Sequence, residues 1–374
     1  MLTLRENFRR IMAFEQFDHM PNWFFGTWPE TKVRWHAEGL EGIGLTGDAG
    51  PSLEGMDPDW EEGMWDIHGL VNIGPLSPIP QEIIEEAGAY RIVRTPLGGI
   101  YKESKQGSSI PQHLKEALLP TRDSWRRFKK FLDAQDNSRW APAWENKALE
   151  LNQRTRVTTI LAGSLFGWPR DWMGVEQISY LAYDDPMLYE EIIEYLAEYF
   201  MALCGPVLKK VDFDFLYFFE DCCGSSGPLF SPAAYRKFYH RYYVKMIEFY
   251  RSLGVKTILM DSDGKTDGLF PCWLDSGFDI LFPIEVGKWQ ADPVFLRQKY
   301  NRRMRMMGGV DKHIIPQGEP AIRAHLERLK GIVAEGGYIP LPDHRIPPDC
   351  SLEQFRVYIR VFNEVFNNTS AFGS

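Results

Sequence analysis

The chain has 374 residues, of which 44% are hydrophobic and 25% are charged, and its formal net charge is −9. Acids and bases are interspersed without any lysine- or arginine-rich run, which argues against nucleic acid as a partner. The 24 Phe, 16 Tyr and 12 Trp residues provide a large core, so folding needs neither disulfides nor a structural metal.

Two further features of the sequence bear on its location in the cell. No apolar run approaches the roughly 20 residues of a membrane span, and the charged N-terminus MLTLRENFRRIM lacks the apolar core of a signal peptide. The five cysteines are an odd number without the spacing of a zinc finger, as is usual in a reducing compartment. We therefore expect a cytoplasmic protein with no membrane partner.

The first predicted element is an amphipathic helix over residues 2–14. Thr3 stands at the N-cap position and Glu6 three residues later, which is the pattern of a capping box. Pro21 to Phe25 (PNWFF) is apolar and aromatic, and we interpret it as the first strand of the main sheet.

An irregular insertion follows over residues 26–120. Residues 26–75 are rich in Gly, Pro and Trp and show no clear period, which predicts short helices and loops. From Ala89 to Glu103, apolar and polar residues alternate on both sides of Pro96–Gly99, which predicts a β-hairpin outside the main fold. A helix is predicted from Pro120 to Asp133, beginning near Thr121.

A regular alternation of strands and helices begins at Arg156. Short β-branched and aromatic runs without polar interruption indicate strands that are covered on both faces, as in parallel sheets. The helical segments between them carry apolar residues at helical spacing and have clear start signals, such as Asp185 followed by Pro186. The predicted strands are residues 156–163, 214–219, 255–260, 279–283, 303–308 and 338–341.

The strand at 255–260 is followed by Asp261 and Asp263. If strand geometry persists through Ser262, the two carboxylates leave the same side of the backbone, and Gly264 then permits a turn. The alternative is that both acids simply cap the following helix, predicted over residues 267–276.

Polar and aromatic residues also follow the other predicted strands. The carboxyl ends of parallel strands are where such folds place their chemistry, so these residues are candidates for a shared site. They are Ser164, Phe166, Arg170 and Trp172 after the first strand of the alternation, then Glu220, Glu285, Asp311, and finally Asp343 with His344.

Strands that alternate with helices at this spacing predict parallel pairing with right-handed crossovers. We predict an α/β fold, a (β/α)8 TIM barrel that forms one domain over residues 1–374, with a disordered tail at 367–374. The alternative is a doubly wound open sheet, which is disfavoured because no Gly-rich phosphate loop follows any strand.

Three stretches of the second half resemble a known family. GGVDKHIIPQGEPAIRAHLERL, EGGYIPLPDHRIPPDCSLEQF and SSGPLFSPAAYRKFYHRYY are similar to the uroporphyrinogen decarboxylase superfamily, and more closely to its corrinoid-linked methyltransferases. The resemblance spans roughly residues 155–366. It implies a TIM barrel with its active site at the carboxyl ends of the strands.

The sequence departs from the true decarboxylases after its first predicted strand. Those enzymes carry an arginine-containing motif there that clamps the carboxylates of the tetrapyrrole, whereas this chain reads FFGTWPETKVRW and retains only Arg34. An acid-lined cavity is also a poor host for a polycarboxylate, because like charges repel. The resemblance therefore points to the methyltransferases.

The methyltransferase relatives hold zinc with a His-x-Cys-Gly motif and a later cysteine. The resemblance places Asp261 and Asp263 at the two motif positions, with Gly264 behind them, and His344 at the last position. These three residues are the predicted metal ligands, for zinc first, with manganese or iron as alternatives. The other possibility is a hydrogen-bonded pair of acid and histidine without metal. Glu220 and Glu285 are the predicted catalytic residues, as proton donor, base or fourth ligand.

The resulting functional prediction is a methyltransferase that demethylates a small methyl ether or amine and passes the methyl group to a corrinoid carried by a partner protein. Two alternatives stay open: a decarboxylase or lyase in which Arg170 binds a carboxylate, and a non-catalytic protein that binds a corrinoid or tetrapyrrole. A homodimer is also predicted, because relatives in the superfamily pair and residues 26–75 offer apolar surface. The predicted substrate-binding residues are Ser164, Phe166, Arg170, Trp172, Asp311 and Asp343.

Overall fold

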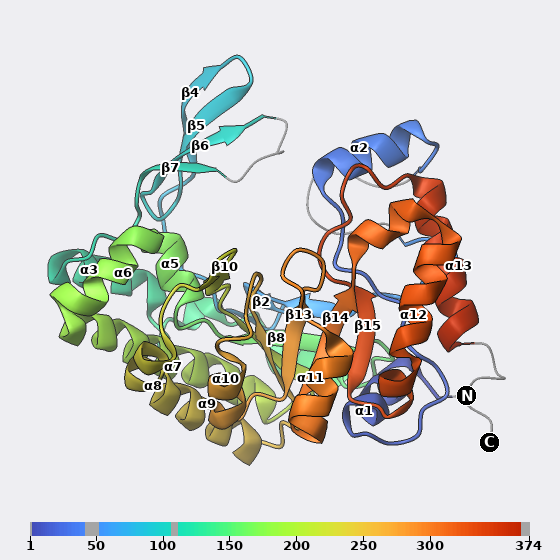
Figure 1. The fold of residues 1–374 in the computed structure, drawn as a ribbon. Coiled ribbons are helices and arrows are strands. Elements are labelled where there is room, and N and C mark those ends of the chain that lie inside the picture. Colours follow the sequence, from blue (N-terminus) through green and yellow to red (C-terminus); the bar gives the residue numbers. More distant parts are fainter. Residues whose placement is uncertain (1, 42–51, 106–110, 368–374) are drawn as a thin grey trace.

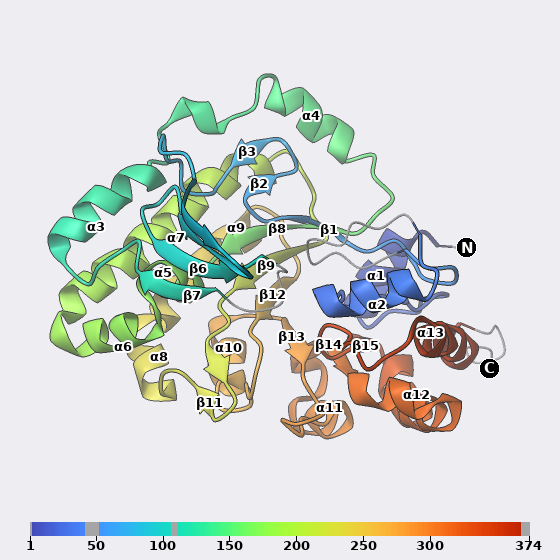
Figure 2. The same cartoon turned by 90° about the horizontal axis from the view of Figure 1, so that it is seen from above.

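The computed structural model describes residues 2–41, 52–105 and 111–367. Its centre is a curled sheet of seven parallel strands with helices on its outer face, as in a TIM barrel (Figures 1 and 2). The strands, in their order across the sheet, are β1 (Glu61–Gly63), β8 (Thr158–Gly163), β9 (Phe215–Phe219), β12 (Ile258–Asp261), β13 (Ile280–Ile284), β14 (Arg305–Val310) and β15 (Tyr338–Pro342).

This strand order settles the choice between the two predicted architectures. Neighbours across the sheet follow one another in the sequence, and every pair is parallel. A doubly wound sheet would reverse its order at one point, where its ligand binds. The barrel-like fold is therefore confirmed, and all six predicted strands of the alternation are present within a few residues of their expected positions.

The first barrel strand is not where the sequence suggested. Residues 21–25 form no strand, and the first position is taken by β1, which pairs with β8 from within the predicted excursion. Residues 20–28 instead run between the two edges of the sheet. Ile346, after β15, exchanges hydrogen bonds with Gly26 and Trp28, while the Trp23 indole donates to the carbonyl of Pro58, just before β1. This segment therefore takes the place of an eighth barrel strand, although few backbone hydrogen bonds join it to the two edge strands.

Most helices of the outer layer follow the predicted pattern. In α1 (Leu4–Met12), Thr3 and Glu6 form the expected capping box, and Asp185 caps α7 (Pro186–Leu208) by accepting the N–H of Leu188. The remaining helices are α2 (Pro29–Ala37), α3 (Arg122–Phe128), α4 (Trp144–Leu151), α5 (Gly167–Met173), α6 (Val175–Asp184), α8 (Pro232–Phe238), α9 (His240–Ser252), α10 (Phe270–Ser276), α11 (Pro293–Tyr300), α12 (Glu319–Ala334) and α13 (Leu352–Phe366).

The predicted hairpin belongs to a larger antiparallel sheet that stands off from the barrel (Figure 1). It comprises β4 (Glu82–Ala87), β5 (Tyr90–Arg94), β6 (Ile100–Ser104) and β7 (Gln112–Lys115), and the hairpin is its β5–β6 pair. Two short hairpins complete the strands: β2 (Asp66–Ile67) with β3 (Val71–Asn72), and β10 (Cys223–Gly224) with β11 (Gly227–Pro228).

Three other predictions concern features that this structure tests in part or not at all. Nearly all of the tail predicted to be disordered, residues 368–374, lies outside the described residues. Within the described ranges, no helix is both long enough and apolar enough to cross a bilayer. The homodimer stays a prediction.

Candidate functional site

Three side chains from the ends of three barrel strands meet at one place. Asp263 follows β12, Glu285 follows β13 and His344 follows β15, and each offers one oxygen or nitrogen atom within 4.8 Å of the other two. The parallel sheet dictates this meeting, because the carboxyl ends of neighbouring strands lie along one edge. We call these residues the strand-end cluster.

His344 is held firmly in the strand-end cluster by aromatic rings. Its imidazole stacks on Trp28 at a centroid distance of 5.6 Å and meets the edge of Phe25 at 5.2 Å. Its Nε2 atom lies 3.4 Å from Oδ2 of Asp263. Both aromatic residues come from the segment that closes the barrel, so this segment positions the histidine although it forms no strand.

Glu285 is buried, and each of its oxygens accepts one hydrogen bond. Oε1 accepts the N–H of Gly264 at 2.9 Å, and Oε2 accepts the indole N–H of Trp289 at 2.6 Å. Burial raises the pKa of Glu285 and nearby Asp263 adds to the rise, against the lowering effect of these hydrogen bonds and of His344. Each oxygen keeps a lone pair for a further partner.

Asp263 contributes an oxygen without a partner. Its Oδ1 atom is buried and receives no hydrogen bond from the described residues. An unpaired buried carboxylate oxygen is costly, and such atoms call for a donor, a water or a cation that completes them. Two carboxylates and one imidazole suit zinc, manganese or iron, so the residues present fit a divalent metal.

Gly264 makes the turn behind Asp263 possible. Its φ is +90°, and a Cβ added there would lie 2.8 Å from the carbonyl oxygen of Cys223. Only glycine therefore fits beneath the β10–β11 hairpin in this conformation. The turn presents the N–H of Gly264 to Glu285, which ties two residues of the strand-end cluster together.

Asp261 lies apart from the strand-end cluster. Its carboxylate is buried and accepts the hydroxyl hydrogen of Tyr217, on the neighbouring strand β9. Burial raises its pKa well above the usual value, and the charge of Asp263 adds to this rise. Strand β12 ends at Asp261, so the alternation that would carry both carboxylates to the same side does not persist. The structure thus joins two of the three predicted ligands, with Glu285 beside them.

Comparisons with known proteins agree with this architecture. The family model of uroporphyrinogen decarboxylase (URO-D) matches residues 159–365, more than half of the chain. The chain belongs to the URO-D family. The match includes all of the strand-end cluster and excludes β1 and everything before it.

A solved structure shares the fold over nearly the whole length. It is a methyltransferase from Methanosarcina mazei, with a TM-score of 0.54 and 12% sequence identity, and the similarity covers 97% of this chain and 99% of that one. At this identity the likeness concerns the fold. No curated protein matches the chain.

Glu220 has a different environment from the strand-end cluster of this URO-D chain. Its carboxylate accepts the backbone N–H groups of Leu165, Phe166 and Gly167 at 2.7, 2.7 and 2.9 Å, at the beginning of α5. Burial raises its pKa, and the three hydrogen bonds oppose that rise. A Cβ on Gly167 would lie 2.6 Å from the carbonyl oxygen of Phe219, so the loop and the strand end are in very close contact. Glu220 therefore joins the loop after β8 to the end of β9.

The predicted substrate-binding residues after β8 are occupied by local contacts. Ser164 donates to the Phe219 carbonyl and accepts the N–H of Trp168. Arg170 forms ion pairs with Asp171 and Asp221. Trp172 packs against Phe128 and Trp168 in the core, and Phe166 packs against Phe230 and borders a groove between α6 and α8.

The two predicted acids after β14 and β15 also accept hydrogen bonds from backbone N–H groups. Asp311 accepts the N–H of His313 and so caps a 3-10 helix at Lys312–Gln317. Asp343 is buried, accepts the N–H of Val286 at 3.0 Å and forms an ion pair with Lys312 at 3.3 Å. Asp343 thereby links the ends of β13, β14 and β15, next to His344.

Sequence reasoning missed the acids around β1. The pKa of Asp59 rises to about 7, because protein surrounds the carboxyl on most sides and Glu62 lies close, although the side chain keeps contact with solvent. Glu62 accepts the indole N–H of Trp60, and its charge helps to raise the pKa of Asp261. The signal was the stretch DPDWEEG, but its strand is only three residues long and has no apolar run.

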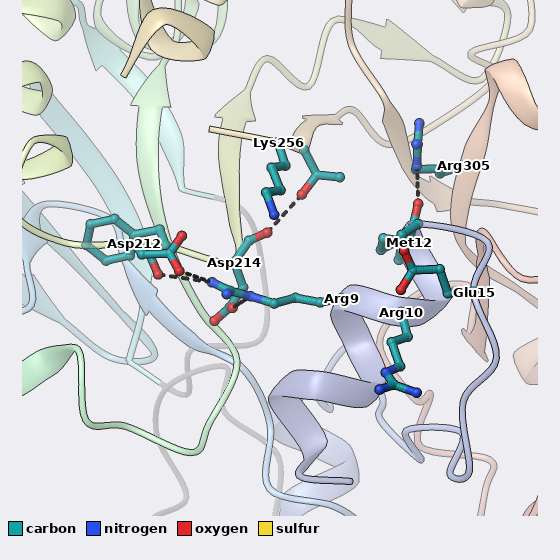
Figure 3. A pocket seen from close by; sticks show the side chains of 11 residues that line it. Arg9, Arg10, Met12, Glu15, Asp212, Asp214, Lys256 and Arg305 are labelled. Carbon is teal, nitrogen blue, oxygen red and sulfur yellow. Dashed lines mark hydrogen bonds and ion pairs between the residues drawn. The ribbon is translucent and has the colours of Figure 1, made fainter. Parts of the chain in front are cut away.

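The opposite end of the barrel contains a cavity of about 190 Å3 (Figure 3). Helix α1 lines one side of it, and the chain segments that lead into β9, β12 and β14 line the rest. Two of the three acids here are paired: Asp214 forms ion pairs with Arg5 and Arg9, and Asp212 also pairs with Arg9. The third acid, Glu15, is exposed, so none of the described residues that line this cavity offers a buried, unpaired carboxylate oxygen comparable to that of Asp263.

Proposed function

We propose that this URO-D family member is a metal-assisted methyltransferase. It would demethylate a small methyl ether or methylamine and pass the methyl group to a corrinoid carried by a partner protein. The observation that carries the proposal is the strand-end cluster with its unpaired Asp263 oxygen. The fold shared with a methyltransferase and the family membership support it.

In this proposal Asp263, Glu285 and His344 hold a divalent metal, zinc first, with manganese or iron as alternatives. A bound metal would supply Lewis acidity that polarises the oxygen or nitrogen bearing the methyl group. The partner's reduced corrinoid would accept the methyl group and supply both electrons of the new bond. The heteroatom would keep the electron pair of the broken bond and take up a proton from water.

The chain's own residues preorganise the donor atoms. Trp28 and Phe25 hold the imidazole of His344, and Gly264 with Trp289 hold the carboxylate of Glu285. Such supporting contacts keep the ligand atoms in position before a metal or substrate arrives. Glu220 is assigned to the architecture and not to proton transfer, because its carboxylate accepts three backbone N–H groups and does not belong to the strand-end cluster.

The decarboxylase alternative needs an arginine that is available to bind the substrate carboxylate, and this requirement is poorly met. Its carboxylate-binding residue would be Arg170, whose guanidinium already meets the carboxylates of Asp171 and Asp221. The acids near Asp261 would also repel an anionic substrate. A methyl ether or methylamine meets neither obstacle.

The metal is tested by titrating apo-protein with zinc and with manganese in a calorimeter, together with elemental analysis. His344→Ala and Asp263→Ala remove a ligand each, and we expect each to weaken metal binding by at least ~100-fold, because even supporting groups contribute ~10 to 100-fold. Asp261→Asn is the matched control and should bind metal as the wild type does. A full metal content in His344→Ala would refute the ligand assignment.

Methyl transfer is tested separately by following methylcobalamin formation from reduced cobalamin with methyl ethers and methylamines. We expect formation with the wild type and loss of at least ~100-fold with His344→Ala. Release of CO2 from a carboxylic acid without any need for cobalamin would favour the decarboxylase instead. Spectral binding of cobalamin with no turnover of either kind would favour the non-catalytic alternative.

A further inference from the structure

A groove of about 630 Å3 lies outside the strand-end cluster, between α6, the β10–β11 hairpin and α8. Figure 2 shows α6, α8 and β11 at the same edge of the molecule. The volume lies within the ~300 to 1,000 Å3 typical of small-molecule sites. The groove is thus large enough for a ligand of a dozen or so non-hydrogen atoms.

The walls of the groove are aromatic and fixed in place. Phe166 meets Phe230 edge-on at a centroid distance of 5.0 Å, and Tyr189 meets Phe238 in the same way at 5.0 Å. Phe166, Tyr189 and Phe238 are buried in the protein behind the groove. Tyr183 forms part of the rim and is 85% exposed. The buried rings fix the half-buried Phe230 in place. The apolar surface left to a ligand is that of Phe230, of Leu229, which is 37% exposed, and of Tyr183.

The charge of the lining has one sign. Among the described residues that line the groove, Lys237 is the charged one, and none is an aspartate or a glutamate. The Lys237 ammonium lies 4.5 Å from the centroid of the Phe238 ring and forms no ion pair with the residues that the structure describes. The nearby hydroxyls of Ser179 and Ser231 already bond to the backbone, to the carbonyl of Val175 and the N–H of Ala234. The Lys237 ammonium is therefore the single charged group that the described lining offers, beside the exposed hydroxyl of Tyr183.

We propose that this groove binds a small apolar carboxylate. The carboxylate would pair with Lys237, and the hydrocarbon body would lie against Phe230, Leu229 and Tyr183. Apolar walls with one lysine complement a ligand that has one negative charge and few other polar atoms. This site does not depend on the proposed function, because its argument uses none of the strand-end cluster.

The β10–β11 hairpin connects the groove with the strand-end cluster. Pro228 lines the groove, while the carbonyl of Gly224 accepts the N–H of Lys265, two residues after Asp263. The carboxylate could therefore be part of the methylated substrate or a separate ligand. Both sources share the same recognition chemistry, and an activity measurement can tell them apart.

The direct test is calorimetry with three probes of one shape: 4-ethylbenzoate, 4-ethylbenzyl alcohol and 4-ethylbenzylamine. We expect saturable binding of the benzoate, binding of the alcohol at least ~10-fold weaker, and the weakest binding for the amine. Lys237→Met should weaken the benzoate by ~10-fold and leave the alcohol unchanged. Ala233→Trp, which fills the groove from the exposed side of α8, should weaken both.

Lys209→Met removes an exposed lysine at the end of α7, away from the groove, and serves as the control that should change nothing. The proposal is wrong if the benzoate shows no saturable binding, if it binds no tighter than the alcohol, or if Lys237→Met binds it as the wild type does. In a methyl-transfer assay, competitive inhibition by the benzoate would show that the groove binds the part of the substrate that carries the carboxylate. A KM unaffected by Lys237→Met would identify a separate ligand.

Discussion

At the amino-terminal end of the barrel, the buried carboxylate of Asp214 is surrounded by cations. It lies 2.8 Å from Arg5, 2.5 Å from Arg9 and 3.6 Å from Arg154. At the carboxyl-terminal end, the buried carboxylate of Asp261 meets a tyrosine hydroxyl and forms no ion pair with any described residue. One sheet thus holds two buried acids in opposite electrostatic settings.

This difference indicates that the acids at the amino-terminal end contribute to stability, whereas those at the carboxyl-terminal end are available for chemistry. Paired ions at the base of the barrel fasten α1 and the loop before β9 to the sheet, which is the usual role of that end in barrels. At the mouth, the charges of Asp263, Asp221 and Glu62 all add to the rise in the pKa of Asp261. Uncompensated like charges are costly and are retained where a bound ligand can use them.

The largest effect should come from exchanging the two buried aspartates for asparagine. Asp214→Asn leaves three guanidinium groups without their carboxylate, and breaking such a buried pair costs about 3–5 kcal/mol. Asp261→Asn keeps an amide oxygen for Tyr217 and removes a repulsive charge, so we expect a change of less than about 1 kcal/mol or a gain. Urea unfolding at pH 7 measures both.

A similar loss of stability in both variants would contradict the comparison. Arg10→Met offers a control near Asp214, because Arg10 bonds to the carbonyl of Gln16 and not to the buried acid. It should cost much less than Asp214→Asn. The metal-free protein should be used for Asp261→Asn, so that unfolding reports the carboxylate alone.

A smaller effect on stability is expected from Glu220→Gln. This variant tests whether Glu220, at the carboxyl-terminal end of the barrel, has a structural or a catalytic role. The amide NH2 group cannot accept a hydrogen bond, so at least one buried N–H of Leu165, Phe166 or Gly167 loses its partner. We expect a loss of about 1–3 kcal/mol in unfolding free energy. Glu248→Gln, on the exposed side of α9, is the control. Unchanged stability with lost methyl transfer would restore Glu220 as proton donor.

The sequence predicted the fold well because the second half of the chain follows simple rules. Buried apolar runs of parallel strands, Pro186 after Asp185, and the glycine that ends α10 all specify local structure directly. The same rules placed Asp263, Glu285 and His344 after strands, and the sheet then brought them together. That Asp263 and His344 belong to one site was therefore predictable from pattern and topology.

The details of the site depend on contacts that no local pattern encodes. Whether Asp261 or Asp263 faces His344 depends on the residue at which β12 ends. The strand β1 has three residues, EEG, and is a strand because β8 offers it a partner. Its acids, and the role of Glu220 beneath α5, arise from pairings across more than 50 residues of sequence. Such long-range pairings decide the environment of each carboxylate.

The smallest effect concerns the pH dependence of stability that Asp59 contributes at the carboxyl-terminal end of the barrel. The pKa of Asp59 rises from 3.8 to about 7 through burial and through Glu62. The folded state therefore binds more protons than the unfolded state between these values, so this residue's contribution to stability is complete below about pH 4 and is lost as the pH rises through about 7. Asp59→Asn should remove this loss. Since the side chain keeps contact with solvent, the change should stay below about 1 kcal/mol. Urea unfolding of wild type and variant at pH 4.5, 6.0 and 7.5 measures it, with Glu248→Gln expected to retain the wild-type slope. If Asp59→Asn also retained that slope, Asp59 would be as well compensated as Asp214, and the contrast between the two ends would be confined to Asp261 and its neighbours.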